Sequence, residues 1–386
     1  MTGSQNSKGL EKADRYYKQY GERAKELKKE GRKIIGYMSA LTPVEILTAA
    51  GVAPIRLKGF MDEAVTKGDA YMESIICPFV RSAFDAAVKG RFGFMDGMVL
   101  PHQCDSIDRT NEVWSSNLNL PYWHFLNVPH VTGGPSIEFM KEILRVFIGT
   151  LEKFLGTKIT DTAIAQAIKA HNENRRLMRE LYILRKQNPP LISGVEMMKV
   201  LVAAMSLPVD ESSALIKSVT EEVKKRPAPA DGNRKRIMII GDQIDHIAIP
   251  EAIENAGAWL VVDDLSIGVK VYWPEVDETT DPLQGIAERY LRKLKIPTTF
   301  VGEGDTYEEN LEARFGHLKQ RIAEFKVDGA ILFIYKYCDP YGFEVPAVKS
   351  YIESGGTPVL YLEDEYSTST LARVKTRIEA FLEMIA

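Results

Sequence analysis

The chain has 386 residues, a formal net charge of −4, 45% hydrophobic residues and 26% charged residues. This composition is typical of a soluble globular protein, and the length predicts two or three domains. Without a basic excess, nucleic acid is not an expected partner, and no apolar run is long enough to predict a membrane span. The N-terminus has no apolar signal core, and three cysteines are too few for a disulfide framework. We therefore expect a cytoplasmic protein whose thiols are free or metal-bound.

Residues 1–32 are predicted to form a polar N-terminal helical arm, and residues 33–135 a first α/β domain. In this domain short apolar runs alternate with helical patterns, which indicates strands joined by helices and hence a parallel sheet. Thr42 is expected to cap the first helix of the domain, with Pro43 at the first helical position. The predicted strands are Lys33–Met38, Ala53–Leu57, Met98–Leu100 and Trp123–Leu126.

Residues 136–228 carry long 3.6-residue apolar patterns and are predicted to be a helical segment. Prolines and a glycine within residues 226–232 indicate a linker. Residues 229–386 form the second predicted α/β domain, whose final helix we expect Ser369 to cap. Its predicted strands are Ile237–Ile240, Trp259–Val262, Ala330–Ile334 and Pro358–Tyr361. The expected fold is α/β, with two Rossmann-like parallel-sheet domains in tandem and an intervening helical segment.

The two predicted α/β domains share a short sequence pattern. Asp96–Leu100 leads to Cys104–Asp105, and Asp328–Leu332 leads to Cys338–Asp339. Each copy has an Asp-Gly turn, an apolar strand, a short polar stretch and then Cys-Asp. We interpret the pattern as a sign that the two domains are structural repeats.

The three cysteines are candidates for a shared site. Cys104 and Cys338 each come just after a predicted strand, which is where open α/β sheets bind ligands. Cys77 precedes Pro78 and an amphipathic stretch, so it is expected near a helix N-terminus, which favours a thiolate. Buried core cysteines, a zinc site and an iron–sulfur cluster are the alternatives. The absence of a close Cys-x-x-Cys pair disfavours structural zinc.

Other polar residues near these cysteines are weaker candidates. His102, two residues before Cys104, can donate a hydrogen bond to a sulfur or to a substrate carbonyl, and Glu344 or Asp339 can serve as an acid. His130 is expected to face the same crevice. An ordinary polar strand end or a solvated loop carboxylate explains these residues as well.

Phosphate-binding motifs are weak or absent. The sequence contains no Gly-x-x-x-x-Gly-Lys-Ser/Thr loop, so ATP binding by that route is not expected. Gly241–Gln243 follows a strand and opens a helix but lacks the further glycines of a dinucleotide fingerprint. An ordinary strand-to-helix turn explains it.

Around the cysteines the sequence resembles the benzoyl-CoA reductase and 2-hydroxyacyl-CoA dehydratase family. The resemblance extends from about residue 33 to the end of the chain. The similar stretches are Ala49–Gly51 with Pro54, Leu100–Ser106, Val262–Leu265, Trp273–Val276 with Asp281–Leu283, Tyr337–Pro340 and Arg377–Met384.

The resemblance implies a [4Fe-4S] cluster between two α/β domains, held by Cys77, Cys104 and Cys338, with one iron left without a protein thiolate. It also implies a related larger cluster-bearing subunit, a separate ATP-hydrolysing activator with its own cluster, ferredoxin as the upstream electron donor and an acyl-CoA substrate. His102 and Glu344 are the candidate catalytic residues.

Two chemistries share this implied scaffold. In one, an electron entering an aromatic thioester starts the reductive loss of ring aromaticity. In the other, a ketyl radical expels a 2-hydroxyl group. The segments Tyr272–Tyr290 and Asp364–Ser367 look closer to the benzoyl-CoA reductase branch, which we therefore expect. A dehydratase subunit and a non-catalytic electron-relay subunit are the alternatives.

Overall fold

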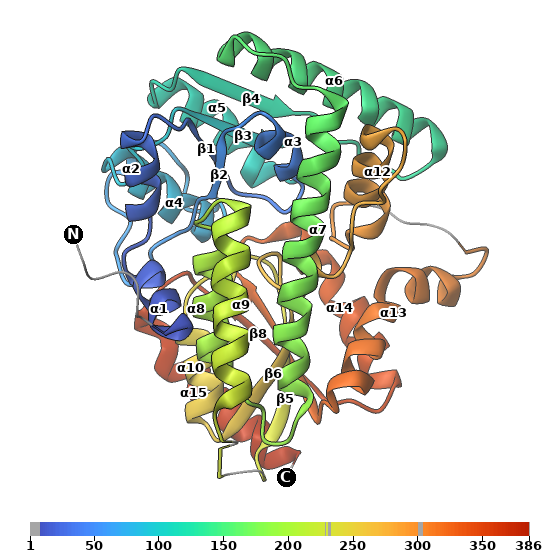
Figure 1. The fold of residues 1–386 in the computed structure, drawn as a ribbon. Coiled ribbons are helices and arrows are strands. Elements are labelled where there is room, and N and C mark those ends of the chain that lie inside the picture. The colour runs from blue at the N-terminus through green and yellow to red at the C-terminus, as the bar shows by residue number, and fades with distance from the viewer. Residues whose placement is uncertain (1–7, 228, 231–232, 300–303, 386) are drawn as a thin grey trace.

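The computed structural model describes residues 8–227, 229–230, 233–299 and 304–385 (Figure 1). It contains two four-stranded parallel sheets with the same strand order, β2-β1-β3-β4 and β6-β5-β7-β8. The first sheet consists of β1 (Ile34–Tyr37), β2 (Ala53–Arg56), β3 (Gly97–Pro101) and β4 (Tyr122–Leu126). The second consists of β5 (Lys235–Ile240), β6 (Ala258–Asp264), β7 (Gly329–Tyr335) and β8 (Val359–Asp364). The predicted fold class, two Rossmann-like parallel-sheet units, is confirmed.

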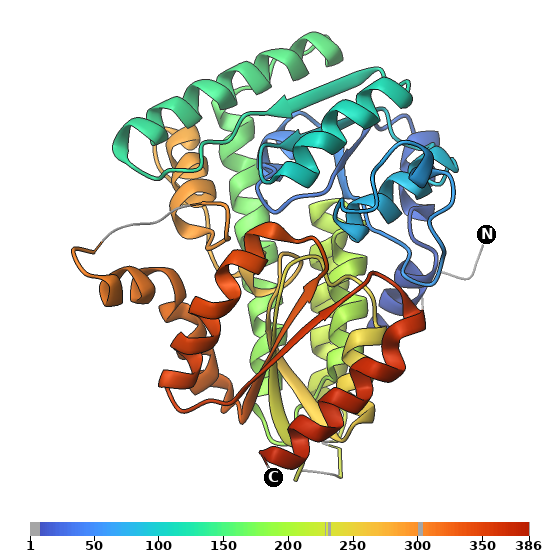
Figure 2. The same ribbon diagram turned by 180° about the vertical axis from the view of Figure 1, so that it is seen from behind.

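Both sheets are covered on two faces by helices, as parallel sheets require. In β5, Ile237 and Ile239 pack toward α10 (Ala248–Asn255) and α15 (Leu371–Met384), while Met238 and Ile240 join the core under α13 (Tyr307–Phe325) and α14 (Asp339–Ser354). Figure 2 shows α13 and α14 on one side of this sheet and α15 on the other. The near-continuous apolar strands of the sequence follow from this two-sided burial.

The first sheet is covered in the same manner. Its helices include α3 (Val44–Ala49), α4 (Pro78–Val88), α5 (Asp105–Asn117) and α6 (Gly134–Leu155). Ile34 and Ile35 of β1 belong to the cores on opposite faces of the sheet. Because strand side chains alternate in direction, consecutive isoleucines serve both faces at once.

The repeat predicted from the two Asp-Gly turns is visible in the backbone. The Ile34 backbone N–H donates to Asp96 Oδ2 at 3.0 Å, and the Arg236 backbone N–H donates to Asp328 Oδ2 at 2.7 Å. Each aspartate thus anchors the start of the neighbouring strand in its own sheet. An aspartate makes the same hydrogen bond to a strand N–H at the equivalent position of each sheet, which supports the interpretation of the two sheets as repeats.

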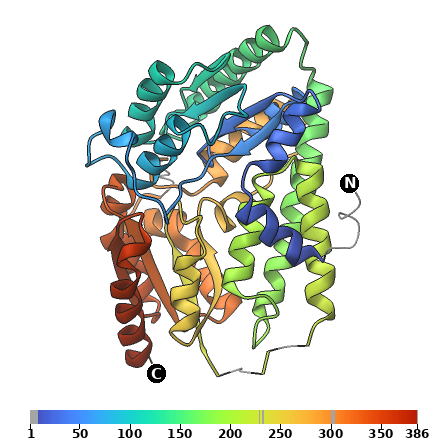
Figure 3. The same ribbon diagram turned by 90° about the vertical axis from the view of Figure 1, so that its left-hand side faces the viewer.

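Between the two sheets in sequence lies a helical segment of α6, α7 (Asp161–Ile183), η2 (Leu184–Lys186), α8 (Gly194–Ala204) and α9 (Val209–Lys225). Helix α7 packs against α3 of the first unit and against α11 (Val269–Tyr272) of the second (Figure 1). The N-terminal helix α1 (Gly9–Lys18) crosses α8 and α9 (Figure 3), and α2 (Glu22–Lys29) packs on β1 and β2. No helix in the described part of the chain is long and apolar enough to cross a membrane.

One segment after β6 packs away from its own sheet. Helix α12 (Pro282–Glu288) and η3 (Arg289–Lys293) lie against α6 and α7. Ile286 and Leu291 share a hydrophobic core with Ile35 of the first sheet. The predicted domain boundary at residues 228/229 stays a prediction. The segment of α12 and η3 follows this boundary in the sequence, but it packs against helices that precede it.

Two predicted helix caps are wrong. Pro43 occupies the N-cap of α3, and the Thr42 hydroxyl makes no hydrogen bond to any described residue. At the C-terminal helix, Ser367 accepts from the Ser369 backbone N–H to start η4 (Thr368–Thr370), and α15 begins only at Leu371. Sequence patterns locate helix ends to within a few residues, and local turn geometry decides the cap. Parts of the predicted arm and linker, residues 1–7, 228 and 231–232, lie outside the described residues.

Candidate functional site

All three cysteines stand at helix N-termini. Cys77 is the N-cap residue of α4, Cys104 that of α5 and Cys338 that of α14. Pro78 begins α4, and Pro340 lies in the first turn of α14. Proline is favoured there because the first N–H groups of a helix have no intrahelical acceptor. Each sulfur is therefore attached where free N–H groups and the helix dipole favour negative charge.

The three cysteines line one open cleft between the two sheets, with a volume of about 2010 Å³ that includes its mouth. Cys77 is tied to the start of α5, because its backbone N–H donates to Ser106 Oγ at 3.3 Å. A smaller pocket is also lined by both Cys77 and Cys338, together with Asp242. Residues that are far apart in the sequence thus share one site, since both sheets direct their strand ends toward the cleft.

The turn before Cys338 adopts an unusual backbone conformation. Tyr337 has φ of 64°, a left-handed conformation that costs a residue with a side chain about 1 kcal/mol or more. The Cys338 backbone N–H donates to the Tyr335 carbonyl at 3.2 Å, which closes the turn. The turn carries the chain from the end of β7 directly to the N-cap of α14.

The protein environment keeps the three thiols neutral. Burial raises the pKa of Cys77 to about 11 and that of Cys104 to about 12. Burial also raises the pKa of Cys338 well above its ordinary value, and the neighbouring Cys77 and Cys104 add to the effect. First-turn N–H groups such as that of Val80 act in the opposite direction at Cys77. The thiols are near enough to interact electrostatically, and together they become thiolates only when a cationic centre compensates them.

The donor set fits an iron–sulfur cluster. Three thiols face one cleft, each at a helix N-terminus that stabilises negative charge. Within the residues that the structure describes, no three His, Cys, Asp or Glu side chains converge so closely that they could hold a metal ion. A cluster needs no such convergence, because each thiolate binds a different iron. The assignment of Cys77, Cys104 and Cys338 as ligands stays a prediction.

The predicted catalytic His102 lies one side chain behind the cleft. His130 lines the cleft, and its ring stacks on that of His102 with centroids 4.2 Å apart. His102 Nε2 is 3.1 Å from Asp108 Oδ2. Burial raises the pKa of Asp108 and lowers the pKa of His130. The His102 ring thus supports His130 by stacking, and of the three side chains His130 is the one that lines the cleft.

The other predicted catalytic residue, Glu344, lines the cleft and forms an ion pair with Arg314 of α13. Burial raises the pKa of Glu344, and Arg314 opposes this effect. Asp339 also lines the cleft, directly after Cys338. A carboxyl with a raised pKa is suited to donate a proton near neutral pH, but the role of Glu344 is untested and stays a prediction.

Asp242, which the sequence pattern places in an ordinary turn, belongs to the cleft in the structure. It follows β5 and lines the pocket shared by Cys77 and Cys338. Burial raises its pKa to about 6, against the opposing charges of Arg56 and Lys270. Its position just after a strand of the second sheet was the available signal. The sequence could not show that the end of β5, where Asp242 lies, faces a cysteine from the other α/β unit.

Large apolar side chains surround the mouth of the cleft. Phe343 is 87% exposed and Tyr307 is 67% exposed, and both line the cleft with the exposed Val131 and Tyr337. Exposed apolar groups gathered around a concave site are typical of a binding surface for an apolar ligand or a protein partner.

These features define the class: an α/β protein with two repeated parallel sheets and a thiol-lined cleft between them. Residues 40–385 match the sequence profile described as "2-hydroxyglutaryl-CoA dehydratase, D-component", and the chain belongs to this family.

Three curated relatives share this length. The (R)-phenyllactyl-CoA dehydratase beta subunit of Clostridium sporogenes is 26% identical, over 94% of this chain and 94% of its own. One of the subunits of the benzoyl-CoA reductase from Thauera aromatica is 26% identical, over 92% and 91%. The beta subunit of the (R)-2-hydroxyglutaryl-CoA dehydratase from Acidaminococcus fermentans is 24% identical, over 93% and 94%. All three are named as subunits of acyl-CoA enzymes, which supports the role of an enzyme subunit for this chain.

Proposed function

We propose that this chain is the [4Fe-4S]-bearing subunit of a multi-subunit enzyme that delivers low-potential electrons to an acyl-CoA thioester. Its first candidate reaction is the reductive dearomatisation of an aromatic acyl-CoA, as in benzoyl-CoA reductase. The observation that carries the proposal is the position of Cys77, Cys104 and Cys338, which cap three helices around a single cleft.

The bound cluster would supply one-electron chemistry, with one iron free of a protein thiolate. The chain's own contribution is electrostatic and steric. The N-termini of α4, α5 and α14 lower the free energy of negative charge at the three sulfurs. The cleft's apolar rim, which includes Phe343 and Tyr307, offers a contact surface to an acyl group or to a partner protein, and such a contact would exclude water from the cleft.

Proton transfer is assigned to groups that line the cleft. Glu344 can hold a proton at its carboxyl because burial raises its pKa. His130 can exchange a proton directly with a bound group, because its ring lines the cleft and its Nε2 lies 3.4 Å from the His102 carbonyl oxygen. Reduction of a thioester substrate consumes protons as well as electrons, so both groups are candidates for the proton donor.

A second candidate reaction is the elimination of water from a 2-hydroxyacyl-CoA. It is supported by the names of two of the relatives, which describe dehydratase subunits at identities equal or close to that of the reductase subunit. Electron relay without substrate contact is the third candidate. In each case we expect a related larger subunit as partner, with ferredoxin and an ATP-hydrolysing activator upstream.

The first test is anaerobic purification followed by iron and acid-labile sulfide analysis and EPR. We expect about four irons and four sulfides per chain and a reducible signal. Zinc, or no metal, would refute the cluster. With the larger subunit and activator present, benzoyl-CoA should give a cyclic diene thioester if the reductase proposal is right. An enoyl thioester formed from a 2-hydroxyacyl-CoA would instead select the dehydratase.

A further inference from the structure

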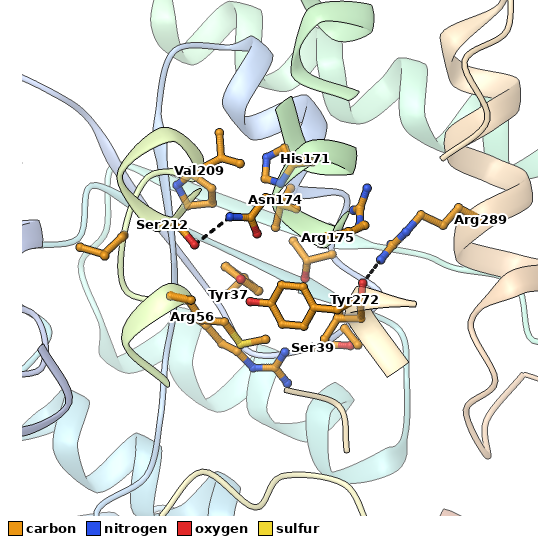
Figure 4. A pocket seen from close by; sticks show the side chains of 18 of the residues that line it. Tyr37, Ser39, Arg56, His171, Asn174, Arg175, Val209, Ser212, Tyr272 and Arg289 are labelled. Carbon is orange, nitrogen blue, oxygen red and sulfur yellow. Dashed lines mark hydrogen bonds between the residues drawn. The ribbon is translucent and has the colours of Figure 1, made fainter. Parts of the chain in front are cut away.

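A second cavity lies at the ends of β1 and β2, where α7, α9 and α11 also contribute to its lining. Figure 4 shows Arg56, Arg175 and Arg289 around Tyr272 in the lining of this cavity. Arg56 comes from β2, Arg175 from α7 and Arg289 from η3. All three arginines are at most 4% exposed, so three cations are buried around one small space.

Carboxylates compensate these cations only in part. Glu45 forms an ion pair with Arg175 and accepts from the Tyr290 hydroxyl at 2.8 Å. Arg56 donates to neutral acceptors, the Ser266 carbonyl at 3.0 Å and Gln243 Oε1 at 2.9 Å. The carboxyl of Asp242, which opposes the charge of Arg56, lies on the cleft side. Within the described residues, one buried carboxylate thus serves Arg175 and Arg289 together.

Arg289 has a donor that no described residue accepts. Its Nε donates to the Pro274 carbonyl at 3.0 Å and its Nη2 to the Val271 carbonyl at 2.9 Å. Its Nη1 is buried and has no hydrogen-bond acceptor of good geometry among the described residues. The guanidinium lies over the Tyr290 ring, with its Cζ 4.6 Å from the ring centroid. A buried, charged donor without an acceptor is costly, which points to an acceptor that the protein itself does not supply.

Further polar groups line the same cavity. The Thr42 hydroxyl is buried and makes no hydrogen bond to the described part of the chain. The Tyr37 and Tyr272 rings and the Asn174 amide also line it. Asn174 Nδ2 donates to Ser212 Oγ at 3.0 Å, the contact drawn in Figure 4. Asn174 Nδ2 also donates to Ser213 Oγ at 3.0 Å, so the buried donors of this lining that have no partner among the described residues are Thr42 Oγ1 and Arg289 Nη1.

The cavity has room for a small anion and an opening to solvent. The space open to the centre of a water molecule is about 70 Å³, and a single water needs roughly 10–15 Å³ on this measure. Most of the lining is buried, but Val44, His171, Val209 and Val271 are only half-buried and mark the side nearest solvent. A ligand of a few heavy atoms fits, and a coenzyme does not.

We propose that this cavity is a binding site for a small oxyanion, held by Arg289 and Arg175. An oxygen of the anion would accept a charge-assisted hydrogen bond from Nη1 of Arg289. Arg175 contributes its positive charge, since its Nη1 and Nη2 already donate to Asn172 and Glu45. Thr42 supplies a neutral donor. The proposal is independent of the cluster, since none of these side chains is a predicted cluster ligand.

The test is isothermal titration of the purified chain with acetate, malonate, phosphate and sulfate at constant ionic strength, with chloride as the balancing salt. We expect one site per chain with a Kd below about 1 mM for at least one oxyanion. Preference for acetate or malonate would identify a carboxylate site, and preference for phosphate or sulfate a tetrahedral one. Values above about 10 mM for all four would overturn the proposal.

Variants separate this cavity from the rest of the surface. Arg289→Met should weaken binding at least about tenfold, because it removes a charge-assisted donor, while Arg289→Lys should retain part of the affinity. Arg145→Met on α6, where Arg145 pairs with Glu142 at the surface, is the matched control and should leave the Kd unchanged. Equal affinity in Arg289→Met and the wild type would refute the assignment.

A milder variant keeps the test valid if Arg289→Met fails to fold. Thr42→Val preserves shape and breaks no hydrogen bond to a described residue, so it should fold normally and weaken oxyanion binding by about 3- to 10-fold. An unchanged Kd would contradict the proposal. Crystals soaked in selenate give a direct readout for the tetrahedral case. An anomalous peak beside Arg289 would support the site, and peaks at surface positions alone would refute it.

Discussion

The cysteine cleft and the arginine cavity are neighbours with opposite chemistry. Two hydrogen bonds join them: the Ser39 hydroxyl donates to Gln103 beside Cys104, and Arg56 Nη2 donates to Gln243 at 2.9 Å. The cleft gathers thiols and carboxyls whose pKa values are raised by burial. The thiols are neutral until a cation arrives, whereas the pKa of Asp242, about 6, leaves this carboxyl mostly ionised at neutral pH. The cavity gathers guanidinium groups, which stay charged.

The comparison teaches how one fold makes two kinds of site. Helix N-termini provide the cleft with donors for anionic sulfurs, and the cysteines need no partner side chains. The cavity lies among strands and helix sides, where backbone groups are already paired, so its charges come from long side chains. We propose that the first site holds a metal cluster and that the second binds a small anion.

The largest expected effect is the loss of the cluster from the cleft. Cys338→Ser should reduce iron from about four atoms per chain to fewer than one after anaerobic reconstitution, because a serine hydroxyl is a poor ligand for cluster iron. Phe343→Ala on the same helix is the control and should keep its iron, since Phe343 is 87% exposed at the rim. Full iron content in Cys338→Ser would break the assignment of this cleft.

The next effect concerns the carboxylate of the cavity. Glu45 is fully buried, and although burial raises its pKa, Arg175 and Arg289 outweigh burial and hold the pKa well below its usual range. Glu45→Gln leaves two buried cations uncompensated and should lower the free energy of unfolding by about 3–5 kcal/mol, measured by urea denaturation.

The same variant sharpens the comparison of the two sites. Without Glu45 the cavity should bind oxyanions more tightly, so phosphate or acetate should restore more stability to Glu45→Gln than to the wild type. Iron content should not change, because the cleft is a separate site. Glu142→Gln, at an exposed ion pair, should cost less than about 0.5 kcal/mol. A loss below about 1 kcal/mol in Glu45→Gln would contradict the charge balance described for the cavity.

A third effect is acid sensitivity at the cavity. Burial lowers the pKa of His171 to about 4, from an ordinary value of 6.5. The unfolded chain therefore binds the proton between pH 6.5 and pH 4 while the folded chain does not, so stability falls as the pH decreases through this window. Because His171 is half-buried, we expect a loss of roughly 2 kcal/mol.

Urea denaturation at about pH 7, 5.5 and 4 measures this loss in the wild type and in His171→Gln. The variant should show a shallower slope, because glutamine does not titrate. The Thr48 hydroxyl, 2.9 Å from His171 Nε2, can still pair with the glutamine amide. If the free energy of unfolding falls with pH equally in the two proteins, a group other than His171 causes the acid sensitivity.

The smallest effect is at the turn before Cys338. Tyr337→Gly should raise the free energy of unfolding by about 1 kcal/mol, because glycine adopts the positive φ of 64° without a Cβ clash. Tyr337→Ala keeps the Cβ and should give no gain. Thermal unfolding of the chain without metal measures both. A loss of stability in the glycine variant would mean that the tyrosine ring, not the backbone, governs this turn.

The fold was predictable because its signals are local. Apolar runs such as Ile237–Ile240 and turns such as Asp96–Gly97 specify strands and their starts, and the Cys-Asp pairs after two of them indicated the repeat. The caps of α3 and α15 were predicted wrongly. Thr42 and Ser369 are good capping residues, but local turns start the two helices one or two residues further along the chain than these caps require.

For the cleft, the sequence by itself determined that Cys104 and Cys338 follow strands and that Cys77 begins a helix. Only the tertiary structure decided that all three, and Asp242 with them, line one cleft, because this depends on how the two sheets face each other.

The arginine cavity carried no sequence signal. Arg56, Arg175 and Arg289 are scattered over a strand, a long helix and the short π-helix η3, with no motif or spacing to relate them. Periodicity records which face of an element is buried. It does not record which charged side chains from distant elements meet there, and that meeting is fixed by packing alone.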